Sequence, residues 1–480
     1  MGDGVNIAAR LEGIAKPGAI CLSEDAYRQV KGRLDFAVTD LGPTELKNIA
    51  EPIRVYSLQV GVPAQAKHAP APAPEKSAPP RLSIAVLPFA NMSGDAEQEY
   101  FADGISEDII TALSKLPQLF VIARNSSFMF KGRHVLVTEV ARSLGVGHVL
   151  EGSVRKSGSR VRITAQLIDA STGGHVWAER FDRELTDVFA VQDDVTAKII
   201  AALAPSLSAA ARQRVMAEQT NNIEAYDCFL RARELLRLHS AKDTNEQAKA
   251  LLRKAIEFDP GFASAHAFLA LAFFNEYSSA WSASPGQSLE EASLAARRAV
   301  ELDPRNPNAQ WVLAIINGSS GRFDEAQFAM EQVIADNPSF AAAHITLGVA
   351  NHYAGKSEEA LACFERAFTL DPNHPGVWLH FQAQALYQLG RYPEAVQVLK
   401  RRILQDPDTD ASPALLAACY GQIGLIEDAR EAWRATMRVN PEFSLEHRRK
   451  TMPYKNPADF ERIVEGLRKA GLPDGPVKTN

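Results

Sequence analysis

The spacing of hydrophobic and polar residues predicts distinct elements along the chain. Between Glu99 and Leu116 apolar residues recur every three or four positions, which predicts an amphipathic helix. Residues 160–169 alternate strictly instead, and they pair with Val149–Arg155 across the turn Lys156–Ser159 in a predicted hairpin with one solvated face. Short apolar runs predict two more buried strands, Ser83–Phe89 and Leu119–Ala123. This mixture indicates an α/β domain.

The C-terminal half repeats with a nearly constant period. Six prolines, each preceded by Asp or Asn, follow at intervals of 44, 34, 34, 35 and 34 residues: Pro260, Pro304, Pro338, Pro372, Pro407 and Pro441. An alanine stands twelve residues before each proline: Ala248, Ala292, Ala326, Ala360, Ala395 and Ala429. A glycine stands seventeen residues before each of the last four: Gly321, Gly355, Gly390 and Gly424. Glycine permits a tight turn, alanine lets two helices approach and proline ends the second helix, so each unit is predicted to be a helix pair.

This pattern resembles the tetratricopeptide repeat, whose period is about 34 residues. The resemblance implies an α-solenoid over residues 223–441 that binds a protein or peptide partner. The alternative is that its concave face folds back on the neighbouring α/β domain. The amphipathic segment Phe460–Arg468 predicts capping helices within residues 442–472, and residues 473–480 are expected to be a disordered tail.

The first residues carry a catalytic motif. The segment GDGVNIAARLE, residues 2–12, resembles the Gly-Asp-x-Val-Asn-x-Ala-Ala-Arg-Leu-Glu segment of class III adenylate/guanylate cyclases. The resemblance implies that Asn6 orients the ribose of the nucleotide and that Arg10 stabilises charge on the transferring phosphoryl group, a role that suits a planar guanidinium. Lys47 matches a late lysine of that family that contacts the triphosphate, although a solvated hairpin residue explains it equally well.

The same resemblance places other functional groups outside these 480 residues. In that family two aspartates on early strands bind Mg²⁺ or Mn²⁺, and a second pair of residues selects the purine. Both sets would lie upstream of Met1, so we expect no cofactor in this chain and no cyclic nucleotide from the chain alone. ATP or GTP, the metal and a homodimer are expected only in a complete cyclase.

Residues 1–60 are therefore predicted to be the C-terminal fragment of a ferredoxin-like cyclase domain. Its expected strands are Ala19–Leu22, Arg54–Val60 and a hairpin between about Phe36 and Ile49. Residues 61–81 contain six prolines and predict an extended, semi-rigid linker to the rest of the chain.

Three further segments resemble a second known family. SIAVLPF at 83–89, YFADGI at 100–105 and VLEGSVR at 149–155 resemble the TolB amino-terminal-type α/β domain that is often appended to bacterial class III cyclases. The resemblance covers residues 82–205, and a connecting helix is expected over residues 206–222. It implies no catalytic assignment, and we expect Asp103, Glu107 and Asp108 on the solvated face and first turn of a helix.

Composition excludes several other classes of protein. The net charge is −6 with interspersed signs, so nothing indicates binding to nucleic acid. The four cysteines are scattered and predict neither disulfides nor a zinc site. No apolar stretch approaches 18 residues, and no signal peptide is visible, so we expect a cytoplasmic protein without a membrane contact.

Together these patterns predict a multidomain α/β plus α architecture, in which a partial cyclase domain precedes a TolB-like domain and a tetratricopeptide solenoid. The resemblances imply a signalling protein of the class III cyclase family. The alternative is a non-enzymatic scaffold or adaptor that holds protein partners through its repeats.

Overall fold

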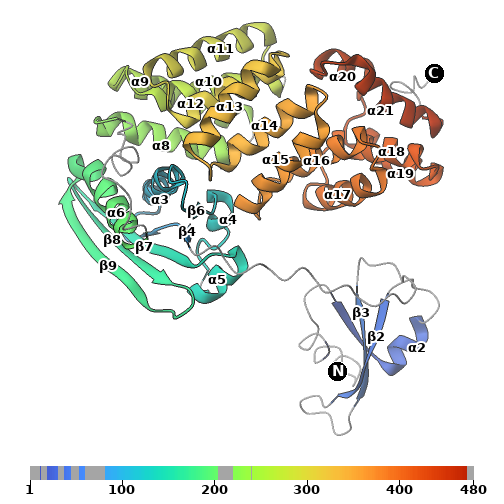
Figure 1. Cartoon of the computed structure of the whole chain (residues 1–480), viewed down its shortest axis with the longest axis horizontal. Helices are drawn as coiled ribbons and strands as arrows, with labels where there is room; N and C mark the ends of the chain where they lie inside the picture. Colours follow the sequence, from blue (N-terminus) through green and yellow to red (C-terminus); the bar gives the residue numbers. More distant parts are fainter. Residues whose placement is uncertain are drawn as a thin grey trace. The chain divides into compact units, whose positions relative to one another are not determined.

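The computed structural model describes residues 11, 19–30, 37–44, 53–59, 82–133, 135–203, 220–238, 241–279 and 281–472. The chain divides into two compact units, Met1–Ser77 and Ala78–Asn480 (Figure 1). The second unit combines a mixed α/β region with a helical repeat region, as the sequence predicts. None of the helices within the described ranges is long and apolar enough to cross a membrane.

The first unit contains a three-stranded antiparallel sheet. Its elements are β1 (Ala19–Ser23), α2 (Glu24–Val30), β2 (Ala37–Thr44) and β3 (Ile53–Gln59), and the strand order is β1-β3-β2. The hairpin predicted between Phe36 and Ile49 is wrong, because β2 is one continuous strand that pairs with β3. Gly42 adopts a φ of 75° at an irregularity in the register of this pairing.

The α/β region is built on a sheet of six strands with the order β6-β4-β7-β8-β9, to which β5 is added beside β7. The strands are β4 (Ser83–Val86), β5 (Ala90–Asn91), β6 (Phe120–Val121), β7 (His148–Ser157), β8 (Arg160–Asp169) and β9 (His175–Glu184). Strands β4 and β6 are parallel to their neighbours, whereas β7, β8 and β9 form antiparallel ladders. The predicted helix and hairpin are therefore present.

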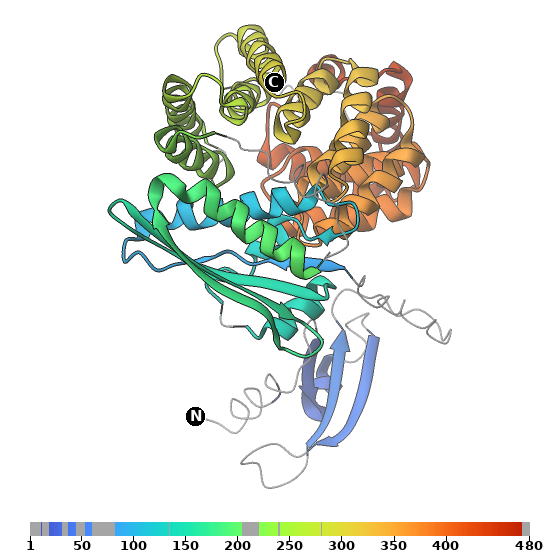
Figure 2. The ribbon, with the colours of Figure 1, turned by 60° about the vertical axis from the view of Figure 1, so that its left-hand side comes forward.

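Helices cover both faces of the sheet near β4. The helices are α3 (Glu99–Ser114), α4 (Arg124–Phe128), α5 (Val137–Leu144) and α6 (Val188–Leu203). The alternating residues Val161, Ile163 and Ala165 of β8 are buried in the same cluster as apolar residues of α3 and α6. Figure 2 shows α6, in green, lying along the face of the sheet. On the other face, α5 packs against Ala85 of β4 in a separate cluster.

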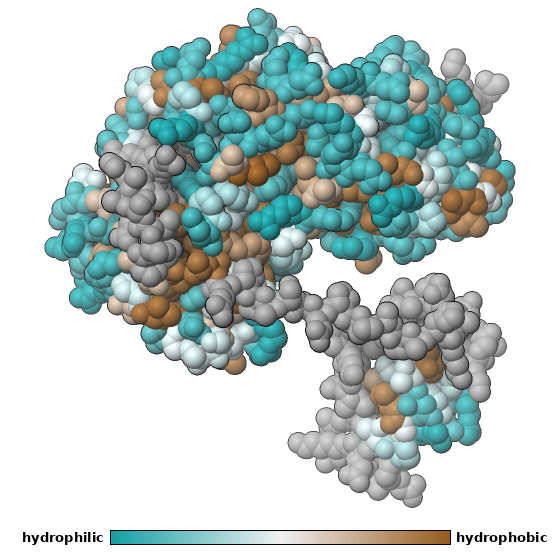
Figure 3. All heavy atoms as spheres, in the orientation of Figure 1, coloured by the Kyte–Doolittle hydropathy of each residue, from teal (hydrophilic) through white to brown (hydrophobic). Residues whose placement is uncertain are grey.

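The repeat region consists of consecutive helix pairs. They are α8 (Ile223–Leu238) with α9 (Lys242–Phe258), α10 (Ala263–Ser278) with α11 (Pro285–Leu302), α12 (Pro307–Ser319) with α13 (Phe323–Asp336), α14 (Ala341–Tyr353) with α15 (Ser357–Leu370), α16 (Val377–Gln388) with α17 (Tyr392–Gln405), and α18 (Ala411–Gln422) with α19 (Ile426–Val439). Polar residues cover most of the repeat surface visible in Figure 3, with apolar residues scattered among them.

Two helices follow the last pair, α20 (Leu445–Thr451) and α21 (Pro457–Lys469). Helix α21 packs on α18 with very close backbones, since a Cβ atom added to Gly421 would lie 1.8 Å from the carbonyl oxygen of Gly466. The segment between α20 and α21 reaches back to α14, where the Lys455 amide donates a hydrogen bond to the Tyr353 carbonyl. The C-terminal helices therefore cover the last repeats through close apolar contact.

Candidate interaction site between the α/β domain and the repeats

The α/β domain lies directly against the first repeat. A single apolar cluster contains Phe101 and Ile105 of α3 together with Tyr226 and Phe229 of α8. The ring of Tyr226 packs edge-on against Phe101 at 6.5 Å and against Phe189 of α6 at 5.0 Å. Burial of these large side chains is worth roughly 1.5–3 kcal/mol each, so this shared core joins the two regions firmly.

A buried polar cluster lies beside this core, centred on Asp108 of α3. Its carboxylate accepts hydrogen bonds from the Tyr226 hydroxyl and from the Arg233 guanidinium, the latter at 3.1 Å. Gln192 of α6 donates to the Tyr226 hydroxyl at 2.9 Å. Burial raises the pKa of Asp108, and the charge of Arg233 opposes that shift. Three helices thus share one cluster of charge that is closed to water.

A second charged group extends the contact to α4. The Arg124 guanidinium lies 2.8 Å from Glu107 and 3.7 Å from the centre of the Phe128 ring, and Lys131 donates to Asp103 at 2.6 Å. Burial raises the pKa of Asp103. We expected Asp103 and Asp108 on a solvated helix face, which is wrong, because the sheet and α8 cover α3 from two sides.

A different contact joins β6 and α4 to the middle repeats. The Val121 amide donates to the Ser339 hydroxyl at 3.2 Å, and the Ala123 amide donates to the Leu370 carbonyl at 2.8 Å. Asp371, which is fully buried, accepts from Ser126 at 2.5 Å and from Asn125 at 2.9 Å. Burial raises the pKa of Asp371. This contact is made almost entirely of hydrogen bonds.

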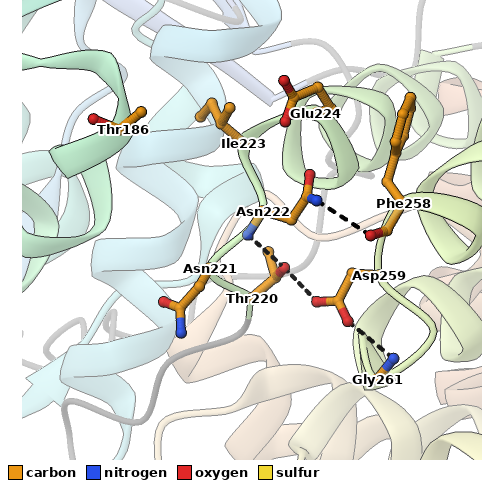
Figure 4. A pocket seen from close by; sticks show the side chains of 9 residues that line it. All are labelled: Thr186, Thr220, Asn221, Asn222, Ile223, Glu224, Phe258, Asp259 and Gly261. Carbon is orange, nitrogen blue, oxygen red and sulfur yellow. Dashed lines mark hydrogen bonds between the residues drawn. The ribbon is translucent and has the colours of Figure 1, made fainter.

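An open pocket of about 690 Å³ lies where the chain enters the first repeat (Figure 4). The side chain of Asn222 donates to the Phe258 carbonyl at 3.1 Å, and Thr220 donates to Asp259 at 2.5 Å. Thr186 of the α/β domain lines the same pocket. Its walls carry amides, hydroxyls and carboxylates, which suit hydrogen bonding to a polar chain better than binding of an apolar ligand.

Apart from the residues of α8, three polar residues that meet the α/β domain or the entry segment lie at the turns between repeats. Asp259, Ser339 and Asp371 are each within one residue of a proline that ends a helix pair. The proline spacing predicted these turns. It gave no indication that the neighbouring domain lies against them, because hydrogen bonds such as that from Asn125 to Asp371 join residues 246 positions apart.

The predicted cyclase residues Asn6, Arg10 and Lys47 lie outside the residues that the structure describes. The repeat positions are all described. The six alanines, which are Ala248, Ala292, Ala326, Ala360, Ala395 and Ala429, have no exposed surface. The four glycines have positive φ angles of 73° to 87°: Gly321, Gly355, Gly390 and Gly424. Over the described ranges, no group of three His, Cys, Asp or Glu residues could hold a metal ion.

Comparison with protein families separates the two regions of the second unit. Residues 318–375 and 352–419 match tetratricopeptide repeat models. Residues 80–198 match the second domain of HilA/YgeH-like transcriptional regulators, a different family from the TolB type that we expected there. The mixed α/β character that we expected is present.

Several solved structures align with the repeats. PilF of Pseudomonas aeruginosa is 21% identical, with 50% of this chain and 96% of that chain covered and a TM-score of 0.35. YrrB, described as a tetratricopeptide protein with an unusual peptide-binding site, is 21% identical, with 40% and 92% covered and a TM-score of 0.29.

One relative aligns with almost the whole chain. A protein of Rhizobium meliloti (strain 1021) named "Putative adenylate cyclase 3" is 44% identical over 471 residues, which are 98% of this chain and 80% of the relative. The chain therefore belongs to the family of that adenylate cyclase relative.

Proposed function

We propose that this protein acts in cyclic-nucleotide signalling as a member of the class III adenylate/guanylate cyclase family. The observation that carries the proposal is the 44% identity to the Rhizobium protein over 98% of the chain. The matches to tetratricopeptide repeats and to a regulator domain support a regulatory role for residues 82–472, in which the repeats bind a protein or peptide partner.

For the nucleotide chemistry we assign Asn6 to the ribose, Arg10 to the phosphoryl group in the transition state and Lys47 to the triphosphate. These assignments rest on the motif of residues 2–12 and on the position of Lys47. Mg²⁺ or Mn²⁺ is proposed as the metal of the cyclase reaction, and no metal-binding role is given to a residue of this chain.

The test is the amount of cyclic AMP and cyclic GMP in cells that express the protein from its own gene. Arg10→Ala should lower turnover by roughly 10²-fold to 10³-fold, as expected when a donor to the transition state is removed. Arg28→Ala is the control, because Arg28 is exposed and pairs with Glu24 on its own helix. Equal amounts of cyclic nucleotide from the unmodified protein and from Arg10→Ala would contradict the assignment.

A purified-protein assay tests a second expectation, that the 480 residues alone form no cyclic nucleotide from ATP or GTP with either metal. Product that scales with the protein and disappears in Arg10→Ala would overturn it.

The alternative function is a scaffold that binds partners without catalysis. The extensive contact between the α/β domain and the repeats favours it, because such a body can present one fixed surface to a partner. If the scaffold function is correct, Arg10→Ala leaves cyclic nucleotide unchanged in cells while the partner is still bound.

A further inference from the structure

We propose that the contact of β6 and α4 with the middle repeats is a releasable clasp, whereas the contact of α3 with α8 is a permanent joint. The clasp is defined here by Val121, Ala123 and Ser126 on one side and Ser339 and Asp371 on the other. The proposal concerns a conformational equilibrium and does not depend on nucleotide chemistry.

The joint has the composition of a protein interior. The largest apolar cluster of the second unit runs from the sheet through α3 and α6 into α8, α9 and α10 without a break. Gly104 of α3 approaches α8 so closely that an added Cβ atom would lie 2.6 Å from Leu230. Separation at this point would expose a continuous core and the charges of Asp108 and Arg233, so it amounts to unfolding.

The clasp has no such core. Among the described residues, the apolar clusters of the middle and later repeats contain no member from the α/β domain. The side chain of Val121 belongs to the cluster of the joint, whose repeat residues lie on α8, α9 and α10. The contacts of the clasp are hydrogen bonds, together with Arg366 over the ring of Phe120 at 5.6 Å. Water can replace hydrogen bonds of this kind at small net cost, so the clasp can open while the joint stays closed.

Asp371 is the centre of the clasp. Its two oxygens accept from Ser126 and Asn125, and the Ser126 hydroxyl accepts from the Asn373 amide at 2.8 Å. Within the described ranges no Lys or Arg forms an ion pair with Asp371, and its hydrogen-bond donors are the neutral side chains of Ser126 and Asn125. A buried carboxylate held by neutral donors regains its hydration when the clasp opens, which favours release.

The repeat side of the clasp keeps its shape without the α/β domain. In the turn after α15, the rings of His374, Phe368 and Trp378 form a mutual cluster, with His374 stacked on Phe368 at 4.3 Å and on Trp378 at 5.6 Å. The His374 amide also donates to the Asp371 carbonyl within the turn. A substitution at the Asp371 side chain should therefore weaken the clasp without collapsing the turn.

In residues 120–123 the backbone amides alternate between hydrogen bonds inside the sheet and hydrogen bonds to the repeats. Their hydrogen exchange therefore distinguishes opening of the clasp from unfolding of the sheet. Phe120 and Ile122 donate to the carbonyls of Leu82 and Ile84 inside the α/β domain. Val121 and Ala123 donate outward to Ser339 and Leu370. Opening would leave these two outward amides unpaired at a strand edge, so a partner that captures the open form would be an extended peptide that supplies carbonyl oxygens there.

Hydrogen exchange resolved to single residues tests the clasp on the full chain. In the unmodified protein we expect Val121 and Ala123 to exchange at least tenfold faster than Phe120 and Ile122. Asp371→Ala should accelerate Val121 and Ala123 about tenfold more and leave Phe120 and Ile122 within twofold. The matched control is Asp406→Ala, since Asp406 precedes the proline of the next repeat and binds Arg402 instead.

Two results would overturn the proposal. One is exchange at Val121 and Ala123 that is as slow as at Phe120 and Ile122 and does not change in Asp371→Ala. The other is acceleration of all four amides together, which would mean that the α/β domain unfolds as a whole. If Asp371→Ala does not fold, Asn125→Ala removes one hydrogen bond of the clasp and should give a smaller acceleration at the same two amides.

Discussion

The two ends of the repeat array are covered in chemically different ways. At the first helix, α8 meets α3 through a core that includes the buried charges of Asp108 and Arg233. At the last pair, α18 meets α21 through Gly421 and Gly466, whose backbones are in direct contact. Buried charge distinguishes the first contact, whereas the second depends on two closely packed backbones and on hydrogen bonds such as that from Gln422 to the Arg462 carbonyl. The two ends should therefore fail in response to different substitutions.

The largest loss of stability should come from removing the partner of one buried charge at the contact of α3 with α8. Arg233→Ala leaves Asp108 buried among neutral groups, which should lower the free energy of unfolding by about 4 kcal/mol. Chemical denaturation followed by circular dichroism measures this loss. Arg231→Ala, two positions away, removes a half-exposed ion pair with Asp227 and a contact with the Tyr100 ring, and should cost about 1 kcal/mol. Equal losses would mean that the buried cluster does not stabilise the joint.

A smaller loss of stability is expected when one methyl group is added at the contact of α18 with α21. Gly421→Ala places a Cβ atom against the Gly466 carbonyl and should push α21 away, at a cost of about 3 kcal/mol. Gly286→Ala is the matched control, because a Cβ atom there meets nothing within 4 Å. Thermal melting of both variants measures the difference. If Gly421→Ala melts like Gly286→Ala, α21 does not pack on α18.

Acid should weaken the C-terminal half in particular. Burial lowers the pKa of His352 to about 3 and that of His380 to about 4. The unfolded chain takes up a proton at each near pH 6.5 and the folded chain does not, so stability is complete above that pH and declines below it. Between pH 7 and pH 5 the loss should be about 2 kcal/mol for each histidine.

This dependence on pH has a direct check. His352→Gln should reduce the slope of unfolding free energy against pH between pH 7 and pH 5, because it removes the group that is protonated only in the unfolded chain. An unaltered slope in His352→Gln would show that His352 does not titrate on unfolding.

The repeats could be predicted from the sequence because the glycine, alanine and proline of a unit each meet a local structural requirement. Gly355 needs a positive φ and Ala360 has no room for a larger side chain, so spacing alone locates the helix pairs. Helix α3 and the β7–β8 hairpin could also be predicted locally, because their apolar residues recur with the period of a helix and of a strand. Strand β9 was not predicted from the sequence. It lies at the sheet edge, and its exposed charged residues, such as Arg180 and Arg183, interrupt the alternation of apolar and polar residues.

The contact between the domains could not be predicted from local patterns. Asp108 and Tyr226 lie 118 positions apart, and nothing near either residue indicates that they meet. The carboxylates of α3 have the spacing of a solvated helix face, and only the covering helix α8 makes them buried. Asn6 and Arg10 remain predictions from the motif, since they lie outside the described residues.

The clasp also constrains how this protein can evolve. Arrays of tetratricopeptide repeats ordinarily gain or lose whole units with little penalty, because each unit touches only its neighbours. Here the α/β domain contacts both α8 and the turn after α15, so its size fixes the distance between these two points of the array. Duplication or deletion of a unit between these two points would move Asp371 out of reach of Ser126. In this part of the array, copy number should therefore stay constant while loops and outer surfaces diverge.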